Sequence, residues 1–76
     1  MDLMANDSVR ELDTVALTVD LPSEGLTKGS VGTVVQVYAP GAFEVEFVGN
    51  DGRTYALATL KADQVLRLNF DPTAAA

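Results

Sequence analysis

The fold of this chain is decided by one continuous stretch, Leu26-Thr27-Lys28-Gly29-Ser30-Val31-Gly32-Thr33-Val34-Val35-Gln36-Val37-Tyr38. Gly29 and Gly32 flank the point where the chain must turn sharply, and a run rich in β-branched residues follows. Glycine permits the backbone angles of a sharp bend, and β-branched side chains favour strands. Such a bend before a hydrophobic strand is typical of a small, strongly curved β-barrel. The stretch predicts an architecture and no chemistry.

The second half of the same stretch, residues 31–38, is a strand with too many apolar residues for simple alternation. Val31, Val34, Val35, Val37 and Tyr38 cannot all face one core. One interpretation is a β-bulge near Gly32–Thr33 that switches the faces. The other is that both faces are covered, one by the core and one by a partner chain.

Four further strands follow from alternation and turn residues on either side of that stretch. A first strand over 13–18 places Val15 and Leu17 on the core face. A third strand over 42–48 alternates aromatic and aliphatic residues with Glu44 and Glu46. The turn over 49–52 predicts a hairpin into a fourth strand over 53–59. Residues 60–64 predict a short 3₁₀ turn, and 65–68 a final strand.

These elements together predict an all-β fold, a five-stranded SH3-like small barrel with one short 3₁₀ turn before the last strand. The chain has 76 residues, which limits it to one domain. We expect a frayed leader over 1–10, the barrel over 11–69 and a flexible tail over 70–76.

Composition narrows the classes of function. The net charge is −6, from 11 acidic and 5 basic residues, so no basic stripe is available for nucleic acid or an anionic membrane. No apolar run is long enough to span a bilayer, and the acidic start does not resemble a secretory signal, so we expect a cytoplasmic, bacterial-type protein. Apolar residues make up 47% of the chain, more than so small a core can hide. That surplus predicts a homodimer or a complex with a protein partner.

Candidate chemistry is sparse. Cysteine and histidine, on which most nucleophilic and acid–base schemes depend, are both absent. Glu44 and Glu46 project from one face of a strand, as a carboxylate pair would, but a solvated outer face explains them equally. The acidic turn over 49–52 offers too few oxygens for calcium. We expect no enzymatic activity, no catalytic, cofactor or metal site, and no small-molecule substrate.

A series of short sequence segments, in their order along the chain, resembles the pattern of a small bacterial family of unknown function with an SH3-like barrel. The resemblance covers residues 11–68 and brings no active-site residues with it. The Gly-x-Val-Gly-Thr-Val pattern is also similar to barrels of the KOW and nitrile-hydratase β-subunit types, which implies a binding or structural role. The segments that carry it are Glu11-Leu12-Asp13-Thr14-Val15, Leu21-Pro22, Gly25-Leu26, Gly29-Ser30-Val31-Gly32-Thr33-Val34-Val35, Phe43-Glu44-Val45-Glu46-Phe47 and Ala62-Asp63-Gln64.

We expect a non-enzymatic module that self-associates, stabilises a subunit or binds a protein partner. The first loop combines apolar and acidic residues, which suits a basic partner segment, although its leucines equally suit a lid over one barrel end. Alternatives are a nucleic-acid-associated KOW-like barrel, or the small acidic partner of a toxin or enzyme encoded beside it. The expected partner-contact residues are Leu21, Pro22, Leu26, Val35 and Tyr38.

Overall fold

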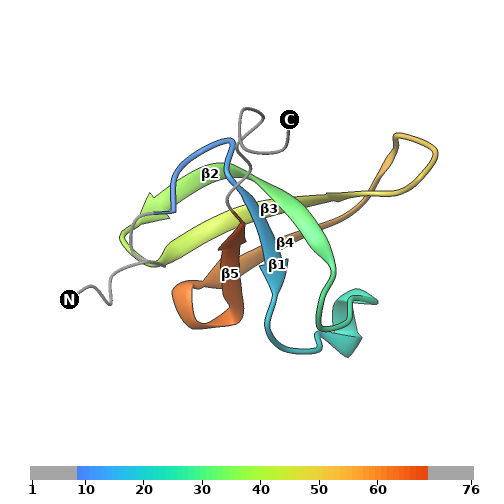
Figure 1. Cartoon of the computed structure of the whole chain (residues 1–76), viewed down its shortest axis with the longest axis horizontal. Helices are drawn as coiled ribbons and strands as arrows, with labels where there is room; N and C mark the ends of the chain where they lie inside the picture. Colours follow the sequence, from blue (N-terminus) through green and yellow to red (C-terminus); the bar gives the residue numbers. More distant parts are fainter. Residues whose placement is uncertain (1–8, 69–76) are drawn as a thin grey trace, which may run out of the picture.

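A computed structural model describes residues 9–68 and shows five strands with two 3₁₀ turns (Figure 1). Residues 1–8 of the expected leader over 1–10, and the whole expected tail over 70–76, lie outside the described residues. The elements are β1 (Thr14–Leu17), η2 (Pro22–Glu24), β2 (Val31–Ala39), β3 (Ala42–Val48), β4 (Thr54–Lys61), η3 (Ala62–Gln64) and β5 (Val65–Leu68). The all-β class, the five strands and the 3₁₀ turn before the last strand are confirmed.

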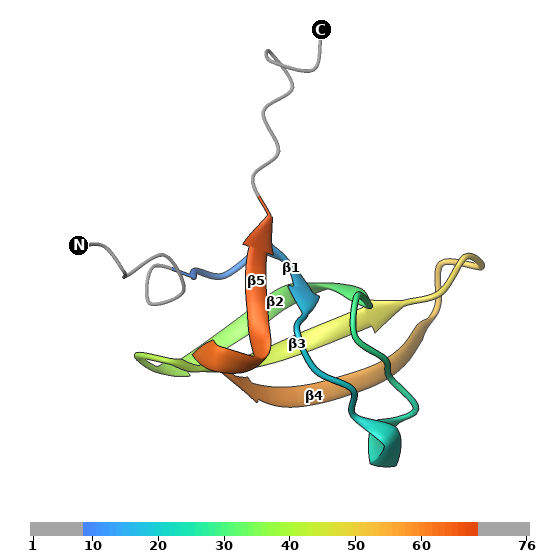
Figure 2. The ribbon, with the colours of Figure 1, turned by 60° about the horizontal axis from the view of Figure 1, so that its bottom comes forward.

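All neighbouring strands are antiparallel, in the order β4-β3-β2-β1-β5. The strands β1 and β5 cross steeply over the longer β2, β3 and β4, so the sheet is strongly bent (Figure 2). Within residues 9–68 no ladder joins β4 to β5, and these two strands form the edges. Hydrogen bonding therefore leaves the sheet open, and the five-stranded antiparallel sheet is the part of the predicted small barrel that the structure shows.

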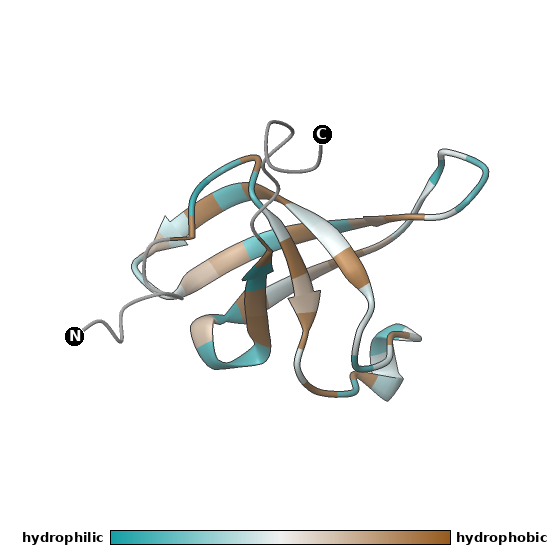
Figure 3. Cartoon of the chain, in the orientation of Figure 1, coloured by the Kyte–Doolittle hydropathy of each residue, from teal (hydrophilic) through white to brown (hydrophobic). Residues whose placement is uncertain are grey.

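The core lies on the inner side of this bend and is entirely apolar. Alternation along β3 is visible in Figure 3, and its inward residues Phe43, Val45 and Phe47 are no more than 1% exposed. The expected core residues Val15 and Leu17 are also buried. Among the described residues no polar or charged side chain is buried, so the interior offers no reactive group. The full core is Val9, Val15, Leu17, Leu26, Val34, Phe43, Val45, Phe47, Ala58, Leu60 and Val65.

Two residues of the expected leader fall within the described part of the chain. Val9 is 5% exposed and belongs to the core cluster. The backbone N–H of Arg10 donates to Oδ2 of Asp13 at 2.9 Å. The packed part of the domain thus includes residues before the expected boundary at residue 11.

Gly32 allows β2 to lie close to β3. A Cβ atom built on Gly32 would stand 2.7 Å from Cγ1 of Val45, 2.8 Å from the carbonyl oxygen of Glu46 and 2.9 Å from Cδ2 of Phe47. Glycine is needed here for space, since the left-handed backbone angle in this segment is at Gly29, with φ 93°. The sharp entry into β2 and its close packing therefore depend on two different glycines.

Irregular pairing with β3 decides which apolar residues of β2 face the core and which are exposed. Its register with β3 shifts between Val34 and Gln36 and again between Val37 and Ala39. The bulge that the sequence suggested near Gly32–Thr33 therefore lies further along the strand. Val34 faces the core, whereas Val35 beside the shift is 40% exposed.

A turn with an unusual residue precedes β1. Leu12 has φ 75°, a left-handed conformation that costs a non-glycine residue roughly 1–2 kcal/mol. The Asp13 N–H donates to the carbonyl of Arg10 at 3.1 Å, which closes the turn. The Leu12 N–H donates to the Val34 carbonyl at 2.7 Å, and the Val34 N–H donates to the Asp13 carbonyl at 2.9 Å. Leu12 and Asp13 thus oppose one residue, as in a β-bulge whose first position usually holds glycine.

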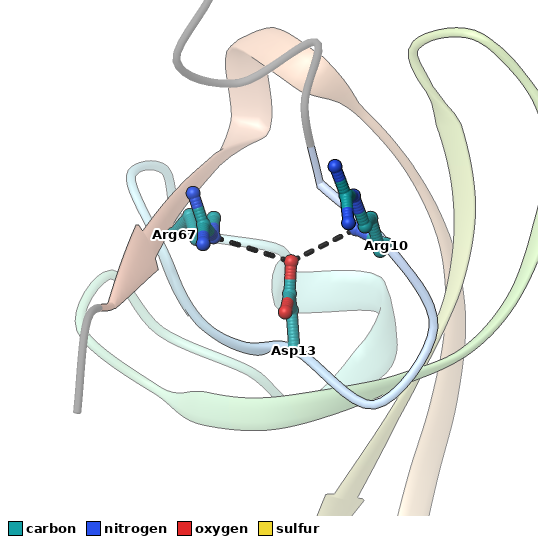
Figure 4. A network of polar contacts seen from close by, with 3 residues as sticks. All are labelled: Arg10, Asp13 and Arg67. Carbon is teal, nitrogen blue, oxygen red and sulfur yellow. Dashed lines mark hydrogen bonds and ion pairs between the residues drawn. The ribbon is translucent and has the colours of Figure 1, made fainter. Parts of the chain in front are cut away.

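One carboxylate holds this turn against the last strand (Figure 4). Oδ2 of Asp13 accepts the N–H of Arg10 and lies 3.2 Å from Nε of Arg67 on β5. The side chains of Arg67 and Asp13 are 39% and 24% exposed, so this ion pair is screened and contributes little on its own. In this turn Leu12 is 80% exposed, and the backbone hydrogen bonds with Val34 fix its position.

Replacing Leu12 with glycine is expected to raise the free energy of unfolding by up to about 1 kcal/mol. The substitution removes the left-handed penalty, and the lost side chain is almost fully exposed. Val19→Gly is the control, because Val19 is an exposed apolar residue without a positive φ, and it should lower stability. Urea unfolding measures both, and a marked loss of stability in Leu12→Gly would refute the strain argument.

Candidate functional site

The first loop, expected to contact a partner, folds partly onto the core. Leu21 and Leu26 form an isolated bridge with two backbone hydrogen bonds, of 2.9 Å and 3.1 Å. Leu26 is 2% exposed and belongs to the core cluster, which leaves its side chain little surface for a partner in this conformation. Leu21 is half-buried against the core, and Pro22 is exposed in η2. The alternative interpretation of the two leucines, as residues that fold back over the interior, agrees with these positions.

The other two expected contact residues, Val35 and Tyr38, lie on β2 and are exposed. Tyr38 is 53% exposed, and its hydroxyl donates to Oε1 of Glu44 on β3 at 3.0 Å. The same oxygen accepts the hydroxyl of Thr59, on β4, at 2.8 Å. Three neighbouring strands thus each contribute one side chain to a single hydrogen-bonded group.

A second carboxylate on β3 is held in a similar way. Glu46 accepts the hydroxyl of Thr54, on β4, through Oε2. Both glutamates are half-buried on the side of β3 that faces away from the phenylalanines. The sequence offered two interpretations of these glutamates, a solvated outer face and a carboxylate pair. The side chains do point outward, and neutral hydroxyl groups orient them.

Strand register fixes the neighbours of these glutamates, because directly opposed residues share a face of the sheet. Glu46 lies between Thr33 and Leu57, and Glu44 lies between Gln36 and Thr59. We call this surface the outer face of β2–β4. It comprises Thr33, Gln36, Tyr38, Glu44, Glu46, Val48, Thr54, Leu57 and Thr59, and Tyr55 adjoins it at the register shift beside Thr54.

The outer face combines apolar and negative groups. Tyr55 and Leu57 are 56% and 53% exposed, respectively. Within residues 9–68 the ion pair is Asp13–Arg67, and neither Glu44 nor Glu46 has a cation within ion-pairing distance. In the same range no group of three or more histidine, cysteine or acidic side chains is arranged to hold a metal ion. The arrangement suits binding of a cationic, partly apolar group.

The hydrogen bond from Tyr38 to Glu44 raises the pKa of Tyr38 above its ordinary value, with smaller contributions from desolvation and from the negative charge of Glu44. Ionisation of the phenol would remove the donated proton and place two negative charges side by side. The neutral phenol is therefore the form that the folded protein favours.

We expect Glu44→Gln to lower the pKa of Tyr38, and Glu46→Gln to leave it unchanged. Ultraviolet titration of the phenol measures this in a Tyr55→Phe background, where Tyr38 is the sole tyrosine. Because the pKa is raised on folding, its stabilising contribution is present below the ordinary tyrosine pKa and is lost as pH rises through the folded value. Equal titration curves for the two glutamine variants would contradict the contact.

Part of this face escaped sequence reasoning. The fourth strand was predicted over 53–59, but the pattern did not point to Thr54 and Thr59 as partners of the glutamates. The available signal was the contrast along β4, where Ala56, Ala58 and Leu60 take the inner positions. Because Ala56 and Ala58 are small, the bulky side chains of this part of β4 lie on the opposite, exposed side.

Comparison with known proteins places most of the chain in one family. A family model described as a domain of unknown function (DUF4926) matches residues 11–67. The searches of curated proteins and of solved structures found no match. Among residues 9–68 there is also no helix with the length and apolarity needed to cross a membrane.

Proposed function

The chain belongs to the DUF4926 family of domains of unknown function, and on that premise we propose that it is a non-enzymatic protein-interaction or subunit-stabilising module. It either self-associates or binds a protein partner. The supporting observation is the exposed apolar surface, because large apolar patches on small soluble domains mark interfaces. The exposed large side chains among the described residues are Leu12, Val19, Val31, Val35, Tyr38, Val48, Tyr55, Leu57 and Leu66.

We further propose that the bent sheet is a small SH3-like barrel, located in the cytoplasm. The strand order, with β5 beside β1 and a 3₁₀ turn between β4 and β5, supports this assignment. A fold of this kind carries many unrelated functions, so it supports no activity by itself. The proposed function therefore rests on the exposed apolar side chains and not on the fold.

A row of apolar residues across β1, β2 and β5, on the same side of β2 as Thr33, supports self-association. Ala16 on β1 is directly opposite Leu66 on β5 and directly opposite Val31 on β2. Opposed residues share a face, so the three form an apolar row across three strands. Leu66 and Val31 are 53% and 50% exposed. Burial of this row against a second copy would remove the largest part of its contact with water, and twofold dimers are the commonest oligomers.

Sedimentation velocity over a wide concentration range tests this proposal. The wild type should self-associate, and the double variant Leu66→Thr with Val31→Thr should do so less, because threonine keeps strand propensity and removes apolar surface. Val19→Thr, at an exposed position outside the strands, is the matched control and should behave as wild type. A protein that is monomeric at every concentration and that crosslinks to no other protein in its native extract would contradict the proposed function.

A further inference from the structure

We propose that the outer face of β2–β4 is a docking surface for a cationic polypeptide segment, with lysine or arginine side chains seated on Glu44 and Glu46. This inference rests on the proposed function and names the partner's chemistry. It keeps Tyr38 among the expected contact residues and places the rest of the contact on β3 and β4 instead of the first loop.

The face has apolar surface to cover. Tyr38, Tyr55 and Leu57 each keep more than half of their surface exposed. They come from β2 and from the edge strand β4, and they surround the two glutamates of β3. No described segment of the chain lies over them. Exposed aromatic rings beside carboxylates suit the aliphatic stems and charged ends of lysine and arginine.

The glutamates retain unused acceptor capacity. Glu44 receives both of its hydroxyl donors on Oε1, and Glu46 receives its donor on Oε2. The second oxygen of each carboxylate has no hydrogen-bond partner within residues 9–68. The present donors are all neutral hydroxyls, so both negative charges are uncompensated. A charge-assisted hydrogen bond from a cation would supply the stronger type of partner.

Spacing limits the partner further. Glu44 and Glu46 are two residues apart on a strand, which places them about 7 Å apart on one face. An extended polypeptide with basic residues at alternate positions has the same period. Such a segment, laid along β3 and β4, would set successive cations on the two carboxylates. The aliphatic stems of these basic side chains would pack on Leu57 beside the carboxylates.

The charge of the whole chain favours the same partner. Its net charge of −6 attracts cationic segments at long range and repels nucleic acid. Two cations border this face: Lys61, opposite Ala42 and two residues beyond Thr59, and Arg53, directly before Thr54. Neither forms an ion pair with Glu44 or Glu46 within residues 9–68, so both carboxylates can still accept an external cation. Charge complementarity therefore selects a basic protein segment over an acidic one.

The test uses the full chain and three defined probes. They are a synthetic peptide of alternating lysine and valine, the same peptide with glutamate in place of lysine, and spermidine. Calorimetry measures affinity, and amide chemical shifts locate the contact. The lysine peptide should bind and perturb residues of β3 and β4, while the glutamate peptide should not bind. Spermidine binding as tight as that of the lysine peptide would overturn the polypeptide assignment.

Charge-matched variants separate a specific site from general attraction. Glu44→Gln with Glu46→Gln should weaken peptide binding by about tenfold or more, because two charge-assisted contacts are lost. Glu24→Gln with Asp63→Asn changes the net charge equally at exposed positions in η2 and η3, and should change affinity by less than about threefold. Equal weakening by both pairs would overturn the site.

A variant without any charge change keeps the test valid if the glutamine pair proves unstable. Leu57→Thr removes exposed apolar surface from the same face and should also weaken peptide binding, whereas Val19→Thr should not. If the lysine peptide fails to bind while the wild type still self-associates, this inference is wrong and the proposed function stands. If self-association and protein crosslinking also fail, the proposed function is wrong as well.

Discussion

Replacing Phe47 with alanine is expected to unfold the protein. Phe47 is 0% exposed at the centre of the apolar core, and truncation of a buried phenylalanine costs about 3–5 kcal/mol. A core this small supplies only about 3–5 kcal/mol of net stability, so the loss consumes nearly all of it. Val45→Ala removes less volume from the same strand and should cost about 2 kcal/mol.

Circular dichroism during thermal and urea unfolding checks this expectation. Tyr55→Ala is the matched control, because it deletes an aromatic ring from the neighbouring strand at a position that is 56% exposed. It should change stability by no more than about 1 kcal/mol. A Phe47→Ala protein that still melts cooperatively near the wild-type temperature would show that the core does not depend on this ring.

Gly32→Ala has the second-largest expected effect, a loss of about 3 kcal/mol. The new methyl group would meet three atoms of β3 at 2.7–2.9 Å, and one of these is the backbone carbonyl oxygen of Glu46. A carbonyl in a paired strand cannot move aside as a flexible side chain can. The strands must separate locally, which disturbs Val45 and Phe47 as well.

The control distinguishes crowding from backbone conformation. Gly25 has φ 71°, and no atom lies within 4 Å of the position that a Cβ would take there, so Gly25→Ala tests a left-handed position in open space. Its cost should be about 1 kcal/mol. If the two alanine variants lose the same stability in urea unfolding, the close contact between β2 and β3 is not the reason for glycine at position 32.

Local patterns predicted most of the strands correctly. Alternation located β3 and its three core residues, because a strand with one buried face repeats every two residues. The turn over 49–52 was also readable: the Gly52 N–H donates to the Gly49 carbonyl at 3.0 Å, and the Asp51 side chain accepts the Arg53 N–H. These features depend on residues that are close in the sequence, so they can be predicted from the sequence.

The candidate site was less predictable. The sequence left two roles open for Leu26, a partner contact or part of a lid over the interior, and only the tertiary structure places it in the core cluster. Tyr38 was predicted as a contact residue, but its link to Glu44 and Thr59 depends on strand register. The apolar excess over 31–38 suggested a bulge in this strand but not its position beside Val35, and that position decides which face each later residue takes.

The amino-acid sequence alone determined the all-β fold class, the apolar core positions of β3, the negative net charge and the absence of cysteine and histidine. The tertiary structure decided where the apolar surplus lies, which glycine is needed for space, and which hydroxyls orient Glu44 and Glu46. The physical reason is distance along the chain. Alternation and turns act between near neighbours, whereas the outer face joins three strands whose relative register is set by packing of the whole core.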